Sequence, residues 1–170
     1  MADEPTFHDR LTTALADPDE RTLSAALASA RAADIAESFE LLGDEERSRI
    51  LFALDPHTAA EIIVMLDEAV RGDVVDELDT QSLTEMMSAL PPDDAADVLG
   101  ELSQEAAGEI LEKMTDEKSD RIEELLEYDE NTAGGIMTPD VVAVPAWATV
   151  ADAVQHVRMA SVAEDSSLSE

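Results

Sequence analysis

One apolar position recurs every twelve residues through most of the chain. Three and four positions before it, most repeats carry two further apolar residues, such as Ile62 and Ile63 before Leu66. Residues three and four apart lie on one face of a helix, so the pattern predicts a series of short helices, each with one buried apolar stripe. The recurring residues are Leu42, Leu54, Leu66, Leu78, Leu90, Leu102, Met114 and Leu126.

Residues that stop one helix and start the next follow each stripe. Asp, Ser and Thr side chains accept hydrogen bonds from the free N–H groups of a helix start, and Pro fits the first helical turn. Each period therefore predicts a helix of about eight or nine residues and a turn of about three. The residues in these positions are Asp55, Pro56, Asp67, Asp79, Pro91, Pro92, Ser103 and Thr115.

Helices this short are not stable alone and need neighbours to cover their stripes. We therefore expect an all-α superhelical solenoid of short antiparallel helices over residues 21–128, with the stripe running from about Leu23 to Leu126. Ser38 and Glu123 interrupt the stripe near its two ends, as is typical of terminal repeats. Residues 1–20 are expected to form a flexible N-terminus and a first helix, and residues 21–32 a longer capping helix.

Composition supports a helical core and limits the partners. Hydrophobic residues make up 45% of the chain but aromatic residues only 3%, which favours packed helices over a sandwich or barrel. The formal charge of −31 repels phosphate backbones and anionic headgroups, so nucleic-acid binding is not expected and cations are the natural small partners. An acid-rich, lysine-poor composition is also typical of proteins kept soluble at high salt, and composition alone is consistent with both readings.

Neither a membrane span nor an enzyme is expected. No apolar run approaches the roughly 18 residues that a spanning helix needs, so direct membrane insertion by this chain is not expected. We expect the isolated chain to be soluble and cytoplasmic. The sequence shows no nucleophile with a base and no phosphate-binding loop, and we interpret His8, His57 and His156 as incidental.

The pattern changes after Leu126, where the twelve-residue period stops. Gly134, Gly135 and Pro139 indicate a turn, residues 141–144 a short strand, and Thr149 the cap of a helix over about residues 150–159. Residues 129–160 thus predict the start of an α/β unit, one strand and one helix without the returning strand that would complete it. Residues 161–170 are expected to be a disordered tail.

The repeats include residues 32–36, 58–62 and 92–98, and they are followed by residues 132–138, which read Thr-Ala-Gly-Gly-Ile-Met-Thr. These segments, in this order, resemble the MgtE magnesium transporter family. In that family a helical superhelix precedes a pair of CBS modules, a connecting helix and a transmembrane pore. The resemblance makes residues 129–160 an incomplete first CBS module. It implies a place on the cytoplasmic face of the plasma membrane, partners in the CBS and transmembrane parts of a transporter, and possible homodimer formation.

The resemblance also implies a magnesium-sensing role and a set of ligands. It implies that Glu61, Asp93 and Asp97 hold magnesium, weakly and for regulation, so that ion bridges gate the pore. Asp93 and Asp97 are four apart on a predicted helix, and Mg²⁺ is usually held by one or two carboxylates. Two alternatives stay open. Asp93 and Asp94 can simply complement a helix N-terminus, and the chain can be a free-standing acidic helical-repeat interaction module not coupled to a pore.

Overall fold

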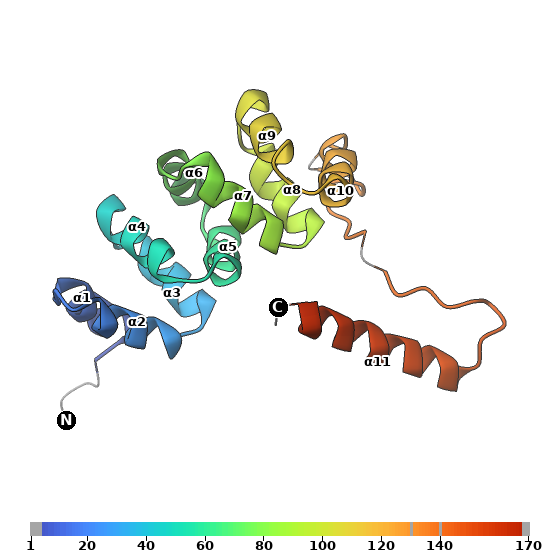
Figure 1. Cartoon of the computed structure of the whole chain (residues 1–170), viewed down its shortest axis with the longest axis horizontal. Coiled ribbons are helices and arrows are strands. Elements are labelled where there is room, and N and C mark those ends of the chain that lie inside the picture. Colours follow the sequence, from blue (N-terminus) through green and yellow to red (C-terminus); the bar gives the residue numbers. More distant parts are fainter. Residues whose placement is uncertain (1–4, 130, 140, 168–170) are drawn as a thin grey trace. The chain divides into compact units, whose positions relative to one another are not determined.

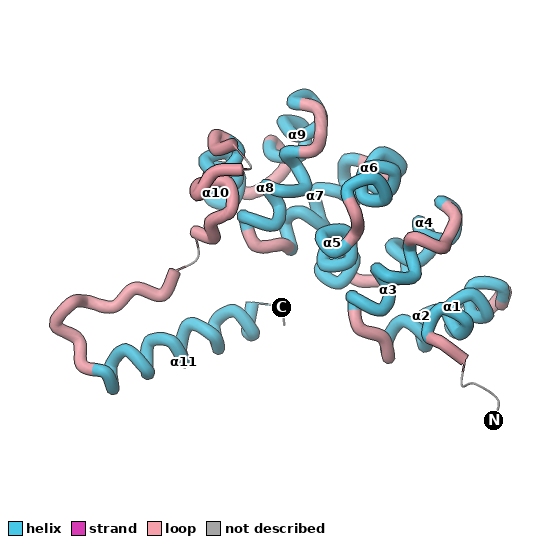
Figure 2. Tube along the Cα trace, turned by 180° about the vertical axis from the view of Figure 1, so that it is seen from behind, coloured by secondary structure: helices cyan, strands magenta, loops and turns pink. Residues whose placement is uncertain are grey.

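The structure is a computed structural model that describes residues 5–129, 131–139 and 141–167. These residues form eleven helices and no strand (Figures 1 and 2). The chain divides into two compact units, the first ending at Met137 and the second beginning at Thr138. No helix among the described residues combines the length and the apolar character needed to cross a bilayer.

Nine consecutive helices begin at intervals of twelve residues, from Glu20 to Asp116, so the predicted repeat is confirmed. The bounds are Phe7–Ala16 (α1), Glu20–Ala28 (α2), Ala32–Phe39 (α3), Asp44–Ala53 (α4), Pro56–Met65 (α5), Glu68–Glu77 (α6), Thr80–Ala89 (α7), Pro92–Gly100 (α8), Gln104–Leu111 (α9), Asp116–Leu126 (α10) and Val150–Ser167 (α11).

Most of the predicted caps act at the helix starts. The Asp55 carboxylate accepts a hydrogen bond from the Thr58 backbone N–H at 3.0 Å, and Ser103 accepts one from the Ala106 N–H at 3.2 Å. These bonds satisfy N–H groups that have no partner within the helix. Asp67 and Thr115 also precede their helices, but neither side chain makes a capping hydrogen bond. The cap positions therefore fix where helices start even where no side-chain bond forms.

From α3 to α10, each helix packs mainly on helices two places away, whereas α1 and α2 pack mainly on each other. One row runs α3, α5, α7 and α9, while α4 packs on α6 and α8 on α10. The stripes of both rows meet in one continuous core, in which Ile50, Ile62, Ile63 and Met87 are fully buried. The helices follow one another in a curved stack from α1 to α10 (Figure 1), which confirms the all-α solenoid.

Four basic side chains bind backbone carbonyls at the C-terminal ends of other helices. The last carbonyls of a helix have no partner within it and carry a partial negative charge, so a cation there supplies both a donor and a favourable charge. Four of the ten basic residues are used in this way, which ties neighbouring helices together. The pairs are Arg49 with Leu15, Arg47 with Phe39, Arg71 with Val64, and Lys118 with Ser88 and Leu90.

The N-terminal end differs from the expectation of one longer helix over residues 21–32. Instead α2 ends at Ala28 and α3 begins at Ala32, because Arg31 adopts an extended conformation between them. The twelve-residue spacing of helix starts therefore begins with α2, one repeat before the repeat that contains Leu42. The end of the stack is covered by α1, which packs on α2 and α3.

The strand expected at residues 141–144 is wrong, since these residues belong to no sheet. A strand needs a neighbour to complete its hydrogen bonds, and the described part of the second unit offers none. Thr149 does cap α11, but the helix runs on to Ser167, through most of the expected disordered tail. No Gly or Pro interrupts residues 150–167, which explains the continuation. The remaining tail, residues 168–170, lies outside the described residues.

Replacing Ile62 by Ala tests how far stability depends on the covered stripe. Ile62 is fully buried, and removing its side chain leaves a cavity in the core between helices. We expect the free energy of unfolding to fall by about 2–5 kcal/mol in urea denaturation. Met65→Ala on the same helix is the control, because Met65 is 53% exposed and should change stability by no more than about 0.5 kcal/mol. Equal effects of the two substitutions would contradict the packing described here.

Replacing Asp55 by Ala tests the helix caps. The Thr58 N–H bond lowers the pKa of Asp55, so its carboxylate stabilises the fold above the usual value of 3.8. We expect Asp55→Ala to lower the free energy of unfolding by about 1 kcal/mol at neutral pH. This difference should vanish as the pH falls through the lowered pKa. Asp67→Ala is the matched control, since Asp67 holds the same position without a capping bond and should have a smaller effect.

Candidate acidic groove

A groove of about 550 Å³ lies along α8 in the first unit. Its walls come from α8, from the end of α10 and from the segment that follows α10, while α5 and α6 each add one residue. Four carboxylates and one guanidinium line it, so the groove carries a net of three negative charges. The lining residues are Val64, Arg71, Asp93, Asp94, Ala96, Asp97, Gly100, Glu101, Leu125, Leu126, Tyr128, Gly135, Ile136 and Met137.

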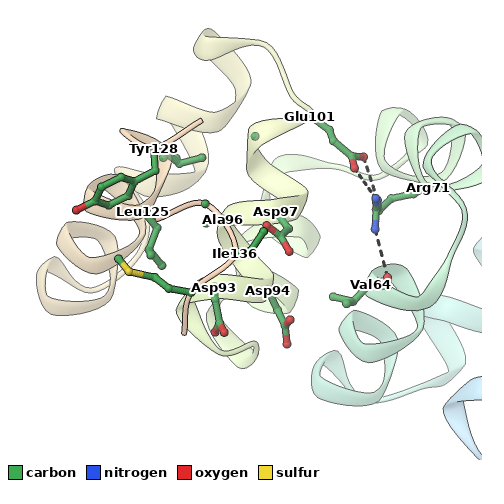
Figure 3. Close-up of a pocket in the computed structure, with 14 residues that line it drawn as sticks. Val64, Arg71, Asp93, Asp94, Ala96, Asp97, Glu101, Leu125, Tyr128 and Ile136 are labelled. Atoms are coloured by element: carbon green, nitrogen blue, oxygen red, sulfur yellow. Dashed lines mark hydrogen bonds and ion pairs between the residues drawn. The ribbon is translucent and has the colours of Figure 1, made fainter. Parts of the chain in front are cut away.

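The sequence of α8 directs its carboxylates to this groove. Pro92 starts the helix in the first turn, and Ala95, Val98 and Leu99 are buried. Positions 93, 97 and 101 are spaced by four and therefore share one helix face, with position 94 beside it. Figure 3 shows Asp93, Asp94 and Asp97 along this helix, with Glu101 at its end.

Two of these carboxylates are in unfavourable surroundings, each for a different reason. The Oδ1 atom of Asp93 is buried and has no hydrogen-bond partner in the structure. Partial burial raises the pKa of Asp94, and the negative charge of Asp93 raises it further. A buried acceptor without a donor and a carboxylate repelled by its neighbour both cost free energy. A cation in the groove would relieve both costs.

The only guanidinium of the groove forms a tight ion pair across the helices. Arg71 of α6 donates from Nε to Oε2 of Glu101 at 2.9 Å and from Nη2 to Oε1 of the same carboxylate. Its Nη1 donates to the Val64 carbonyl oxygen at 3.2 Å (Figure 3). The side chains are only 15% and 25% exposed. Arg71 thus links α5, α6 and α8 at one end of the groove.

The segment after α10 folds back to form the opposite wall. Ile136 and Met137 donate backbone hydrogen bonds to Thr132 and Gly134, and the Gly135 N–H donates to the Thr132 hydroxyl. At Gly134 the chain lies so close to the Tyr128 ring that a Cβ atom would overlap it. Gly134 therefore allows a close approach here, directly before Gly135, Ile136 and Met137, which line the groove.

The structure brings two of the three predicted metal ligands together. Asp93 and Asp97 line the same groove. Glu61 does not line it, although Val64, one helical turn further along α5, does. The Glu61 carboxylate instead lies 3.6 Å from Nε2 of His57, and its side chain is 44% exposed. Among the described residues, no group of three or more His, Cys, Asp or Glu side chains is arranged to hold a metal ion.

Other groove residues were missed from the sequence. The spacing of four continues from Asp97 to Glu101, so this residue could have been found by extending the pattern. Arg71 stands 30 residues before Glu101, and no local pattern connects the two. Gly135 is predicted from the sequence only as part of a turn, and Tyr128 is not singled out by any pattern. Long-range packing decides these positions.

A family comparison matches residues 30–131 of the chain, more than half of it, to the model described as the MgtE intracellular N domain. The chain belongs to this family. No curated protein sequence matches the chain. Because the family describes an intracellular domain, the expected cytoplasmic placement of these repeats is confirmed.

Two solved structures share the fold. One is the cytosolic domain of the Mg²⁺ channel MgtE in complex with ATP, with a TM-score of 0.81 and 28% identity over 91% of this chain. Another is the soluble part of a magnesium transporter, with a TM-score of 0.77 and 22% identity, a level that shows the fold alone. This chain covers 63% and 61% of those chains. The predicted MgtE-type helical domain is therefore confirmed, whereas the CBS fragment stays a prediction.

Replacing Asp94 by Asn tests the charge repulsion between Asp93 and Asp94 in the acidic groove. Because its pKa is raised in the folded state, the charged form of Asp94 destabilises the fold above the usual value of 3.8, and the full cost is present above the raised pKa. We expect Asp94→Asn to raise the melting temperature in magnesium-free buffer at neutral pH and to have no such effect at about pH 3. Asp116→Asn is the control, an exposed first-turn carboxylate of α10 that should bring no gain. A lower melting temperature for Asp94→Asn at neutral pH would contradict the prediction.

Proposed function

We propose that this chain is the magnesium-sensing cytosolic domain of an MgtE-type magnesium ion transporter, and that its acidic groove binds Mg²⁺ weakly through Asp93 and Asp97. Family membership and the fold of a Mg²⁺ channel's cytosolic domain support the transporter context. The observation that carries the ion role is the unpartnered, buried Oδ1 atom of Asp93 inside a groove with a net of three negative charges.

The groove chemistry suits Mg²⁺ in particular. Mg²⁺ is a hard cation that takes oxygen ligands, keeps several of its waters and is usually bound by one or two carboxylates. A site of that kind needs no cluster of three protein ligands, which agrees with the described residues. Asp94 adds negative charge beside Asp93 and attracts a cation without having to contact it. Such a site is open to water and therefore weak, as a sensor of abundant magnesium has to be.

The position of the groove offers a route from binding to gating. One wall is α8, and the other ends in Ile136 and Met137, the last residues of the first unit. A cation bound between these walls favours the arrangement in which they are close, because it offsets the charge of the carboxylates. Binding shifts a gate only through its different affinity for the closed and open arrangements. In this proposal, ion bridges from the helical domain to the CBS region hold the pore closed when magnesium is plentiful.

Glu61 has a separate place in this proposal. It stands 36 residues before Asp97, at the equivalent position of the repeat, but it lies on α5 in the other row of helices. Its partly exposed carboxylate is available to a bridging ion outside the groove. The alternative of a free-standing interaction module stays a prediction, since these observations do not test it.

A magnesium titration by calorimetry in potassium chloride tests the proposed site. We expect Asp93→Asn/Asp97→Asn to bind Mg²⁺ roughly tenfold more weakly than the unaltered chain, because two negative charges next to the ion are lost. Asp116→Asn/Asp120→Asn is the matched control. It removes two exposed carboxylates at the same spacing from α10, away from the groove lining, and should leave the affinity nearly unchanged. If both double variants bind like the unaltered chain, the groove is not the magnesium site.

A further inference from the structure

We propose that Arg71 is a built-in counter-ion of the acidic groove that sets how tightly a divalent cation is held there. This inference rests on the proposed function, since it concerns the regulation of the same site. Among the described residues that line the groove, only Arg71 is positively charged. It comes from α6, while three carboxylates come from α8 and the fourth is its C-cap residue, Glu101.

The geometry assigns Arg71 two separate effects on the groove. Its paired N–H groups occupy both carboxylate oxygens of Glu101, so Glu101 is not available as an ion ligand. Its charge also remains inside the groove wall, because the side chain is 15% exposed and is held by a third hydrogen bond to Val64. A fixed positive charge repels any incoming cation. Arg71 thus lowers the affinity for divalent ions both by taking up a carboxylate and by repulsion.

This arrangement differs from that of the other helix-capping cations. Arg47, Arg49 and Lys118 also bind carbonyl oxygens at helix ends, but none of them lines the acidic groove. Arg71 combines the hydrogen bond to the Val64 carbonyl with an ion pair to Glu101. A guanidinium can do this because its donors form a planar fork that matches a carboxylate.

A purely structural role predicts the opposite result from a charge role. If Arg71 only holds α6 and α8 together, removing it loosens the groove and weakens ion binding. If it acts as a counter-ion, removing its charge strengthens binding, although a helix contact is lost. The sign of the change in affinity therefore separates the two roles.

Four variants of the 170-residue chain make this test, with MgCl₂ as the titrant in calorimetry at about 0.15 M potassium chloride. Arg71→Gln should bind Mg²⁺ roughly three- to tenfold more tightly, because the groove loses its positive charge. Glu101→Gln should bind more weakly by a similar factor. The double variant Arg71→Gln/Glu101→Gln keeps the net charge and should bind like the unaltered chain. Arg71→Lys keeps the charge without the fork and should also stay close to the unaltered affinity.

Helix content by circular dichroism verifies that each variant is folded at the titration temperature. The inference is overturned if Arg71→Gln binds magnesium equally or more weakly, or if Arg71→Lys changes the affinity as much as Arg71→Gln does. These outcomes are distinct from failure of the proposed function. If the proposed function fails, Asp93→Asn/Asp97→Asn binds Mg²⁺ like the unaltered chain. If only the Arg71 inference fails, that double variant still binds Mg²⁺ more weakly than the unaltered chain.

Discussion

The structure depends on one constraint, which is that a helix of about ten residues cannot bury its own apolar stripe. From α3 to α10, each helix relies on a helix two places away to cover its apolar residues. The twelve-residue step fixes where each helix begins, and with it the direction in which every polar position points. The line of carboxylates along α8 is thus a consequence of the repeat. Residues 93, 97 and 101 share one face because Ala95, Val98 and Leu99 occupy the core on the other side of the helix.

The second constraint is the charge that this surface has to carry. Forty-one acidic residues repel one another, and only ten basic residues are available to offset them. Four of those ten bind carbonyl oxygens at helix C-termini. These carbonyls carry a partial negative charge, so a cation there stabilises the fold. Most carboxylates are left to solvent and dissolved ions. The groove carboxylates are different, because burial of Asp93 and Asp94 removes part of that screening.

The sequence predicted whatever depends on local pattern. The period, the helix starts and the caps at Asp55 and Ser103 follow from neighbouring residues, and so does the placement of Asp93 and Asp97 on one helix face. The strand at residues 141–144 could not be judged in this way, because a strand exists only with a partner. The ion pair of Arg71 with Glu101 joins residues 30 apart in the sequence, on α6 and at the end of α8. No sequence pattern near either residue indicates its partner.

The end of the solenoid explains why the groove lies at α8. Glu61, Asp73, Glu85, Asp97 and Glu109 occupy the same position in successive repeats, so an acidic residue there is a general property of the surface. Only Asp97 of these lines the groove, because the chain after α10 folds back beside α8 where the repeats end. The close contact of Gly134 with Tyr128 fixes that return. A repeated surface carboxylate thus becomes part of a partly enclosed site at the place where the solenoid meets the segment that follows it.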